Sequence, residues 1–215
     1  MNVRFALYLL VALAPSLFLH EYAHALTADR LGDPTPRRWG RLSFNPRPLI
    51  DPFGTVILPG LLLVLIASGL FVPLFAYTKP FPHDPTYLRN RERDELLVQL
   101  SGPLLSLALA VIAGIVLRTT VAGEAGLFIF AVVYVNLLLF VFNLMPIPGL
   151  DGARILARFL PPRAREVYRN LDQYLALFML LVFFLLGGLF LGIVNALSGG
   201  LCRAVTGGAG LCGIF

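Results

Sequence analysis

Four long stretches of this 215-residue chain contain no charged side chain. They cover residues 52–78, 96–117, 125–150 and 173–202. A fifth apolar stretch, residues 5–28, is interrupted only by His20, Glu21 and His24. A membrane-spanning helix needs about 20 apolar residues, and each of these stretches is longer than that. The sequence therefore predicts an all-α polytopic membrane protein.

The composition agrees with this class and excludes several others. Hydrophobic residues make up 58% of the chain and charged residues 13%, against about 45–50% and about 25% in soluble proteins. Disorder and a disulfide-dense secreted scaffold are excluded, although Cys202 and Cys212 could either pair or remain free. The net charge of +5 does not indicate nucleic-acid binding, because the basic residues flank apolar stretches and form no separate domain. We expect one membrane domain over residues 1–215, in contact with the lipid bilayer.

The first apolar stretch has two interpretations. Its basic N-terminus and the small residues of Ala12-Leu13-Ala14 are typical of a cleaved signal peptide. Pro15 directly after that site argues against cleavage, and removal would leave an apolar remnant ahead of His20. We therefore favour an uncleaved first transmembrane helix.

His20, Glu21 and His24 form the pattern His-Glu-x-x-His inside this first stretch. Residues four apart lie on the same face of a helix, so both imidazoles can bind one metal ion. Zinc suits imidazole ligands, and Glu21 is placed to take a proton from a metal-bound water. A chance match is the alternative, but three ionisable side chains within lipid each cost on the order of a few kcal/mol unless they have partners. The pattern therefore predicts a zinc site.

A catalytic zinc site needs a third protein ligand, and Asp151 is the best candidate. It follows the stretch 125–150 directly after two prolines and a glycine, which end the helix and permit an irregular backbone. The carboxylate can turn inward to the metal there; alternatively, it could cap a helix that begins near Ala153. His83 is the main rival, but it lies in a polar loop with three prolines, where we expect it to be solvated.

Several motifs of the chain occur together in one protein family. They are His20-Glu21-x-x-His24, Phe44-Asn45-Pro46, Ile50-Asp51-Pro52-Phe53-Gly54-Thr55 and Asn143-x-x-Pro146-x-Pro148-x-x-Asp151-Gly152. This set resembles the site-2 protease family of intramembrane zinc metalloproteases, in its small prokaryotic branch without a PDZ domain, over about residues 15–155. The resemblance implies one Zn²⁺ per chain, bound by His20, His24 and Asp151, with Glu21 as the general base.

The resemblance also implies substrate-binding residues. Asn143 would help to hold the substrate or the transition state. Ser106 lies where the family pattern Gly-Pro-x-x-Asn has its asparagine, and a hydroxyl is shorter than an amide and has fewer hydrogen-bonding groups. The implied peptidase domain has a catalytic core at about residues 5–155 and a C-terminal helix at about residues 172–198.

The predicted ligands can meet only in a particular topology. If all five stretches crossed the membrane, His24 and Asp151 would lie on opposite sides of a bilayer core about 30 Å thick. A re-entrant segment at residues 52–78 removes this conflict. It also places the nine basic residues of 30–93 and the five of 154–169 on one side, fourteen of seventeen in all. We expect about four transmembrane helices plus this segment, in the cell membrane, with the active site towards the cytoplasm. The alternative is that residues 52–78 cross the membrane fully, which requires strongly tilted helices.

The sequence thus predicts hydrolysis of peptide bonds in or near transmembrane segments of other membrane proteins, its expected partners. A substrate helix must unwind first, and a short β-hairpin around residues 37–48 could offer a strand edge to it. An ordinary basic loop is the alternative there, and we expect its arginines, Arg41 included, to be membrane-surface anchors. The alternative function is a metal-binding membrane protein without proteolysis, but no transporter-like repeat is visible and Glu21 is present.

Overall fold

The computed structural model describes residues 3–43, 45–69, 76–79, 82–119, 123–171, 192 and 196–207. Within these residues the secondary structure is helical and contains no β-strand, which confirms the predicted all-α class. The labelled elements are α1 (Val3–Leu31), α2 (Thr35–Arg38), η1 (Pro52–Ile57), α3 (Leu58–Ala67), η2 (Pro85–Tyr87), α4 (Arg91–Thr119), α5 (Glu124–Asn143), α6 (Asp151–Ala157) and α7 (Pro162–Leu171). Element η1 is a π-helical turn and η2 a 3-10 turn.

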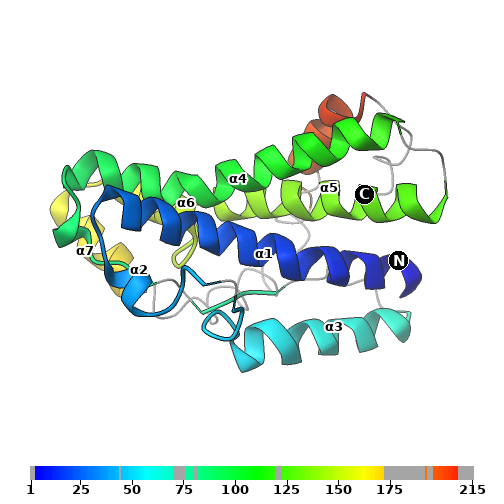
Figure 1. The fold of residues 1–215 in the computed structure, drawn as a ribbon, viewed down its shortest axis with the longest axis horizontal. Coiled ribbons are helices and arrows are strands. Elements are labelled where there is room, and N and C mark those ends of the chain that lie inside the picture. Colours follow the sequence, from blue (N-terminus) through cyan, green and yellow to red (C-terminus); the bar gives the residue numbers. More distant parts are fainter. Residues whose placement is uncertain are drawn as a thin grey trace.

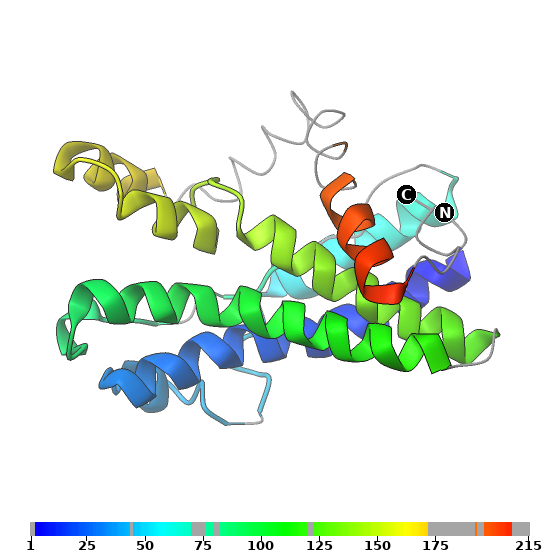
Figure 2. The same ribbon diagram turned by 90° about the horizontal axis from the view of Figure 1, so that it is seen from above.

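Among the described residues, three helices, α1, α4 and α5, are long and apolar enough to cross a membrane. They pack side by side, with α4 antiparallel to α1 and α5 (Figure 1, Figure 2). The core between α1 and α5 is apolar and includes Leu13 and Leu139. Within the same interface Asn136 donates a hydrogen bond from Nδ2 to Ser16 Oγ, 2.9 Å away. Such a bond between buried side chains contributes about 1 kcal/mol to helix association in a membrane.

The C-terminal helix predicted at about residues 172–198 lies outside the described residues, except for residues 192 and 196–198. Residues 196–206 are helical, and Cys202 is buried in a cluster with Ala110 and Phe130. Cys202 is disulfide-bonded. The second cysteine of the chain lies outside the described residues.

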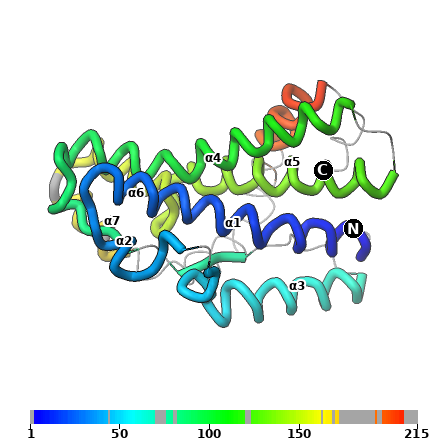
Figure 3. The backbone as a smooth tube through the Cα atoms, in the orientation of Figure 1, coloured from blue at the N-terminus to red at the C-terminus, as the bar shows by residue number. Residues whose placement is uncertain are grey.

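The predicted re-entrant segment, residues 52–78, begins with a well-capped turn. Asp51 Oδ1 accepts hydrogen bonds from the N–H groups of Phe53 (3.1 Å) and Gly54 (2.7 Å). Proline at the start of η1 suits this position, because its missing N–H would have no partner in the first turn. Elements η1 and α3 then run beside the N-terminal half of α1 (Figure 3).

Residues 76–79, at the end of the re-entrant segment, lie beside the residues where it begins. Residues 76–79 run nearly straight along the beginning of the segment (Figure 3). Tyr77 donates from its N–H to Gly54 O (3.1 Å), and Lys79 donates from its N–H to Leu49 O (3.0 Å). The two ends of the segment therefore lie together, as the re-entrant prediction requires.

The short β-hairpin expected around residues 37–48 was wrong. The chain forms α2, with Pro36 in its first turn, and continues in turns. The N–H of Arg41 donates to Pro36 O (2.9 Å), which closes the chain back on this helix. Pro46 and Pro48 lack the N–H groups that a strand ladder needs, so turns replace the expected strands.

The end of α1 and the beginning of α4 meet at one end of the bundle, where Arg89 donates from its N–H to Leu31 O (3.4 Å). The connection between these two helices therefore starts and finishes at the same end. Helix α5 runs towards the same end but stops well before it, and α6 follows it after a short loop (Figure 2). This arrangement brings the second half of α1 and the first residue of α6 to the same level.

Candidate metal centre

Two histidines in the second half of α1 face the helices α4 and α6. His20 and His24 are four residues apart, so the helix stacks them on one face. Their Nε2 atoms lie 3.2 Å apart, and the residues are only 2% and 1% exposed. An imidazole buried this deeply is costly unless its ring nitrogens have partners. The neighbours of those nitrogens therefore decide what the site can bind.

The third group of the site is Asp151, the first residue of α6. Its Oδ2 lies 3.2 Å from His20 Nε2 and 3.1 Å from His24 Nε2. The preceding loop makes this approach possible, since Gly149 has a φ of +94°, which favours glycine, and Leu150 is extended. Leu150 occupies the N-cap position. The carboxylate of Asp151 is consequently directed at the histidines and is not the helix cap.

The three converging donor atoms fit a zinc ion. They are 3.1–3.2 Å apart, and a tetrahedral zinc with ligands at about 2.0–2.1 Å keeps its donors about 3.3 Å apart. Two imidazoles and a carboxylate are typical of catalytic zinc, which leaves its fourth position open. Among the described residues this is the one group of three or more His, Cys, Asp and Glu side chains arranged to hold a metal ion. The structure thus brings together the three predicted ligands.

Hydrogen bonds from α4 fix the orientation of both imidazoles. His24 Nδ1 lies 2.7 Å from the carbonyl oxygen of Val98, and His20 Nδ1 lies 2.9 Å from Ser106 Oγ. A partner on the second ring nitrogen sets the tautomer and the direction of the ring. Both histidines therefore present Nε2 to the position between them and Asp151.

Gly102 of α4 leaves the space in which the ring nitrogens converge. A Cβ atom at this position would collide with His24 Nε2 and would lie 2.7 Å from His20 Nε2. Only glycine allows the backbone of α4 to approach the ligands so closely.

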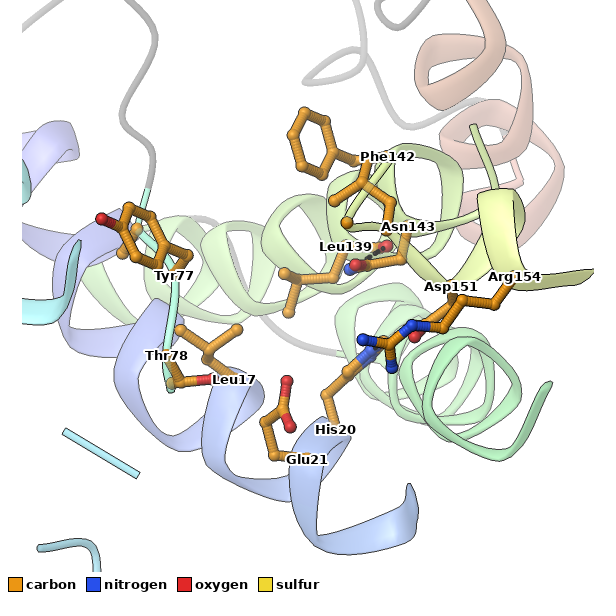
Figure 4. Close-up of a pocket in the computed structure, with 13 residues that line it drawn as sticks. Leu17, His20, Glu21, Tyr77, Thr78, Leu139, Phe142, Asn143, Asp151 and Arg154 are labelled. Atoms are coloured by element: carbon orange, nitrogen blue, oxygen red, sulfur yellow. Dashed lines mark hydrogen bonds and ion pairs between the residues drawn. The ribbon is translucent and has the colours of Figure 1, made fainter. Parts of the chain in front are cut away.

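A pocket opens beside the three ligands (Figure 4). Its lining includes Glu21 and Asn143 as well as His20 and Asp151, and about 70 Å³ is accessible to water-sized groups, which is room for ordered water. Glu21 Oε2 is buried and has no hydrogen-bond partner among the described residues. Such an oxygen, next to a metal position and a space for water, is suited to accept a proton from that water.

The two residues expected to bind substrate have different surroundings. Asn143, the last residue of α5, lines the pocket and donates from Nδ2 to Leu139 O (2.9 Å). Ser106 is fully buried against His20 and is absent from the described lining of the pocket. Asn143 is therefore in reach of a molecule in the pocket, whereas Ser106 is in contact with His20, a candidate metal ligand.

The expectation that His83 is solvated was wrong. Its side chain is 9% exposed, and its Nδ1 lies 2.9 Å from Oδ2 of the fully buried Asp33. Asp33 also accepts hydrogen bonds from the N–H groups of Thr35 and Asp84, each 2.9 Å away. Burial raises the pKa of Asp33, but these donors outweigh burial and lower the pKa below its ordinary value. His83 thus belongs to a polar cluster that joins the end of α1 to the loop before η2.

Arg41 is buried, whereas the sequence predicted that it anchors the chain at the membrane surface. Arg41 is only 6% exposed and donates from Nη1 to Lys79 O (3.2 Å). Burial lowers the pKa of Arg41, and the negative charge of Glu21 opposes this shift. The guanidinium therefore lies near the candidate general base. The sequence around Arg41 could not indicate its burial, because Arg41 contacts Lys79, which is distant in the sequence.

Comparisons with known proteins agree with this site. The profile of peptidase family M50 matches residues 118–187. "Putative zinc metalloprotease YwhC" of Bacillus subtilis is 33% identical over 186 residues, which cover 82% of this chain and 80% of that protein. "Putative zinc metalloprotease Rip2" of Mycobacterium tuberculosis is 34% identical over 189 residues, which cover 83% of this chain and 68% of that protein. No solved structure matches the chain.

Proposed function

Because the chain belongs to peptidase family M50, we propose that this zinc metalloprotease hydrolyses peptide bonds within or next to transmembrane segments of other membrane proteins. The observation that carries the proposal is the convergence of His20, His24 and Asp151 beside Glu21 in a bundle of membrane-length helices. One zinc ion per chain would occupy the position between the three ligands.

Each residue around the site has a separate role in the proposed hydrolysis. Zinc, when bound, supplies the Lewis acidity that polarises the scissile carbonyl and makes a neighbouring water more acidic. Glu21 accepts a proton from the attacking water and delivers it to the leaving amine. Asn143 holds the substrate backbone through its side-chain amide at the pocket wall. Ser106 acts through His20, whose ring it orients.

The straight segment 76–79 suits the approach of an unwound substrate. Tyr77 and Lys79 direct their N–H groups to the residues at the start of the re-entrant segment. In an extended chain the backbone groups of Thr78 then point to the opposite side, as in an edge strand. Thr78 lines the pocket, and its buried Oγ1 has no partner among the described residues. These features support pairing of the substrate backbone with Thr78.

The distribution of arginines supports an active site that faces the cytoplasm in a multi-pass protein of the cell membrane. Arg47 and Arg89 are exposed, and Arg89 lies where α1 ends and α4 begins. At the other end of α1, Arg4 is paired with Glu124 at 2.9 Å. Cytoplasmic loops carry the excess of basic residues in membrane proteins, so the end with the metal ligands is assigned to the cytoplasm.

A cleavage assay tests the proposed function. Wild type and Glu21→Gln are purified in detergent, loaded with zinc and incubated with a panel of model transmembrane substrates. We expect one zinc ion per chain in both proteins and cleavage by wild type alone, because the amide of glutamine cannot accept the proton. Zinc-loaded wild type that cleaves nothing across a broad panel would instead support a metal-binding protein without proteolysis.

The third ligand is tested separately with Asp151→Ala. Loss of one of three protein ligands should abolish zinc binding measured after dialysis against a chelator. Full zinc content and full activity in this variant would contradict the assignment of Asp151.

A further inference from the structure

A positively charged side chain lies at the wall of the pocket that contains Glu21. Arg154 is three residues after Asp151 on α6, a spacing that puts both side chains on one face of the helix. Arg154 lines the pocket, and its side chain extends from α6 towards His20 and Glu21 (Figure 4). It is the only lysine or arginine among the described residues of this lining.

The helix that carries Arg154 is held firmly at both ends. At its beginning, a Cβ atom on Gly152 would collide with the backbone carbonyl of Leu144, so α6 packs directly on the preceding loop. At its end, Arg165 donates from Nε to Ala157 O (3.2 Å), which satisfies one of the last carbonyl groups of the helix. Arg154 therefore projects from a helix with a packing contact at one end and a hydrogen bond at the other, which favours a preorganised position.

Peptide hydrolysis creates a negative charge that this pocket must stabilise. The water oxygen forms a bond to the carbonyl carbon, the π electrons of the C=O bond move to its oxygen, and the water proton goes to Glu21. When the electrons return, the C–N bond breaks, and Glu21 gives its proton to the leaving nitrogen. The charge on the carbonyl oxygen exists only between these two steps, so a donor aimed at that oxygen lowers the barrier selectively.

We propose that Arg154 is a catalytic residue whose guanidinium donates hydrogen bonds to the scissile carbonyl oxygen while it is negatively charged. This assignment rests on the proposed peptidase function. Asn143 is a weaker candidate for the same task, because its amide is neutral. A guanidinium keeps its charge at every physiological pH, has five N–H donors, and acts more strongly in a buried site than in water.

The test uses the full-length, zinc-loaded protein and three variants. Arg154→Gln removes the charge, Arg154→Lys keeps it with different geometry, and Arg163→Gln removes an exposed arginine of α7 as the matched control. Zinc content, kcat and KM are measured with one cleavable transmembrane peptide. Binding of a phosphonamidate analogue of that peptide, an anionic mimic of the tetrahedral intermediate, is measured without turnover.

We expect Arg154→Gln to lower kcat about 100-fold with zinc content and KM nearly unchanged, as for loss of one oxyanion donor. The same variant should also bind the phosphonamidate about tenfold more weakly. Arg154→Lys should recover part of the loss in kcat and part of the loss in phosphonamidate binding, because it keeps the charge. Arg163→Gln should match wild type in both measurements. Unchanged kcat, a loss confined to KM, or loss of zinc in Arg154→Gln would overturn the proposal. Wild type that neither cleaves the peptide nor binds the phosphonamidate would instead overturn the peptidase function itself.

Discussion

His24 donates a hydrogen bond from Nδ1 to the carbonyl oxygen of Val98, 2.7 Å away. A carbonyl group can only accept, so Nδ1 carries a proton, and in the neutral imidazole Nε2 presents its lone pair towards His20 and Asp151. Helix α4 thus determines which nitrogen of an α1 histidine can bind metal. Because Ser106 on the same helix contacts His20, the orientation of both candidate histidine ligands depends on the packing of α4 against α1.

The first prediction concerns Ser106→Ala, which removes the partner of His20 Nδ1. We expect zinc affinity to fall about 10–100-fold, because the imidazole loses the bond that fixes its direction. Competition with a chelator of known affinity measures this change. Ser68→Ala is the matched control, since the Ser68 hydroxyl donates locally to Val64 O at the end of α3.

The same variant separates the two roles considered for Ser106. If Ser106 contacts substrate, KM measured at saturating zinc should rise while zinc affinity stays at the wild-type value. Unchanged zinc affinity would therefore contradict the role as a partner of His20.

The second prediction concerns Gly102→Ala. The added methyl group occupies the space between the two imidazoles, so we expect zinc content to fall close to zero after dialysis. The thermal unfolding midpoint should also fall, since α4 must move away from α1 to relieve the overlap. Gly60→Ala is the control, because an added Cβ there meets no atom within 4 Å. Stoichiometric zinc in Gly102→Ala would show that the ligands converge differently.

The third prediction concerns the pH dependence conferred by Asp33. Its folded-state pKa is lowered, so its contribution to stability is complete above the ordinary carboxyl pKa of about 4. The contribution is lost as pH falls below that value through the lowered pKa. At pH 7 we expect Asp33→Asn to reduce the free energy of unfolding by about 1–3 kcal/mol, since an amide satisfies the three buried donors less well.

Thermal unfolding in detergent between pH 3 and 7 would measure this difference, with the exposed Glu166→Gln as the control. The difference in thermal unfolding midpoint between wild type and Asp33→Asn should become smaller as the pH approaches 3. If the difference in midpoint were the same at every pH between 3 and 7, the contribution of Asp33 to stability would not be electrostatic.

The fourth prediction concerns topology. Cysteines introduced as Arg47→Cys and Arg89→Cys flank the re-entrant segment at exposed positions, and Thr119→Cys lies at the far end of α4. A membrane-impermeant maleimide should label Thr119→Cys on intact cells and the other two only after permeabilisation. Labelling of Arg47→Cys and Arg89→Cys from opposite sides would refute the re-entrant segment.

The helical class could be predicted because the length of an uncharged stretch is a local property of the sequence. The convergence of His20, His24 and Asp151 could be anticipated for a different reason. Ionisable groups within lipid are too costly to remain without partners, and few residues were available to complete a metal site. Chain reversal at residues 52–78 followed from the need of these ligands to meet at one level.

The polar connections could not be predicted in the same way. Arg41 and His83 are buried by residues far away in sequence, so their local surroundings resemble those of an exposed loop. The expected hairpin at residues 37–48 failed because a strand needs a partner, and the prolines and turns there provide none. The spacing between Asp151 and Arg154 is visible in the sequence. It indicates the proposed role of Arg154 only when the structure shows that both residues line the pocket.

The order in which the ligands are synthesised has a biological consequence. His20 and Asp151 are separated by 131 positions, and α4 and α5 lie between them in the chain. A ribosome therefore releases the last ligand only after both helices have been translated. Until then, the nascent polypeptide has two of the three candidate ligands and no complete metal site. The candidate metal site can therefore be completed only once translation has reached the first residue of α6.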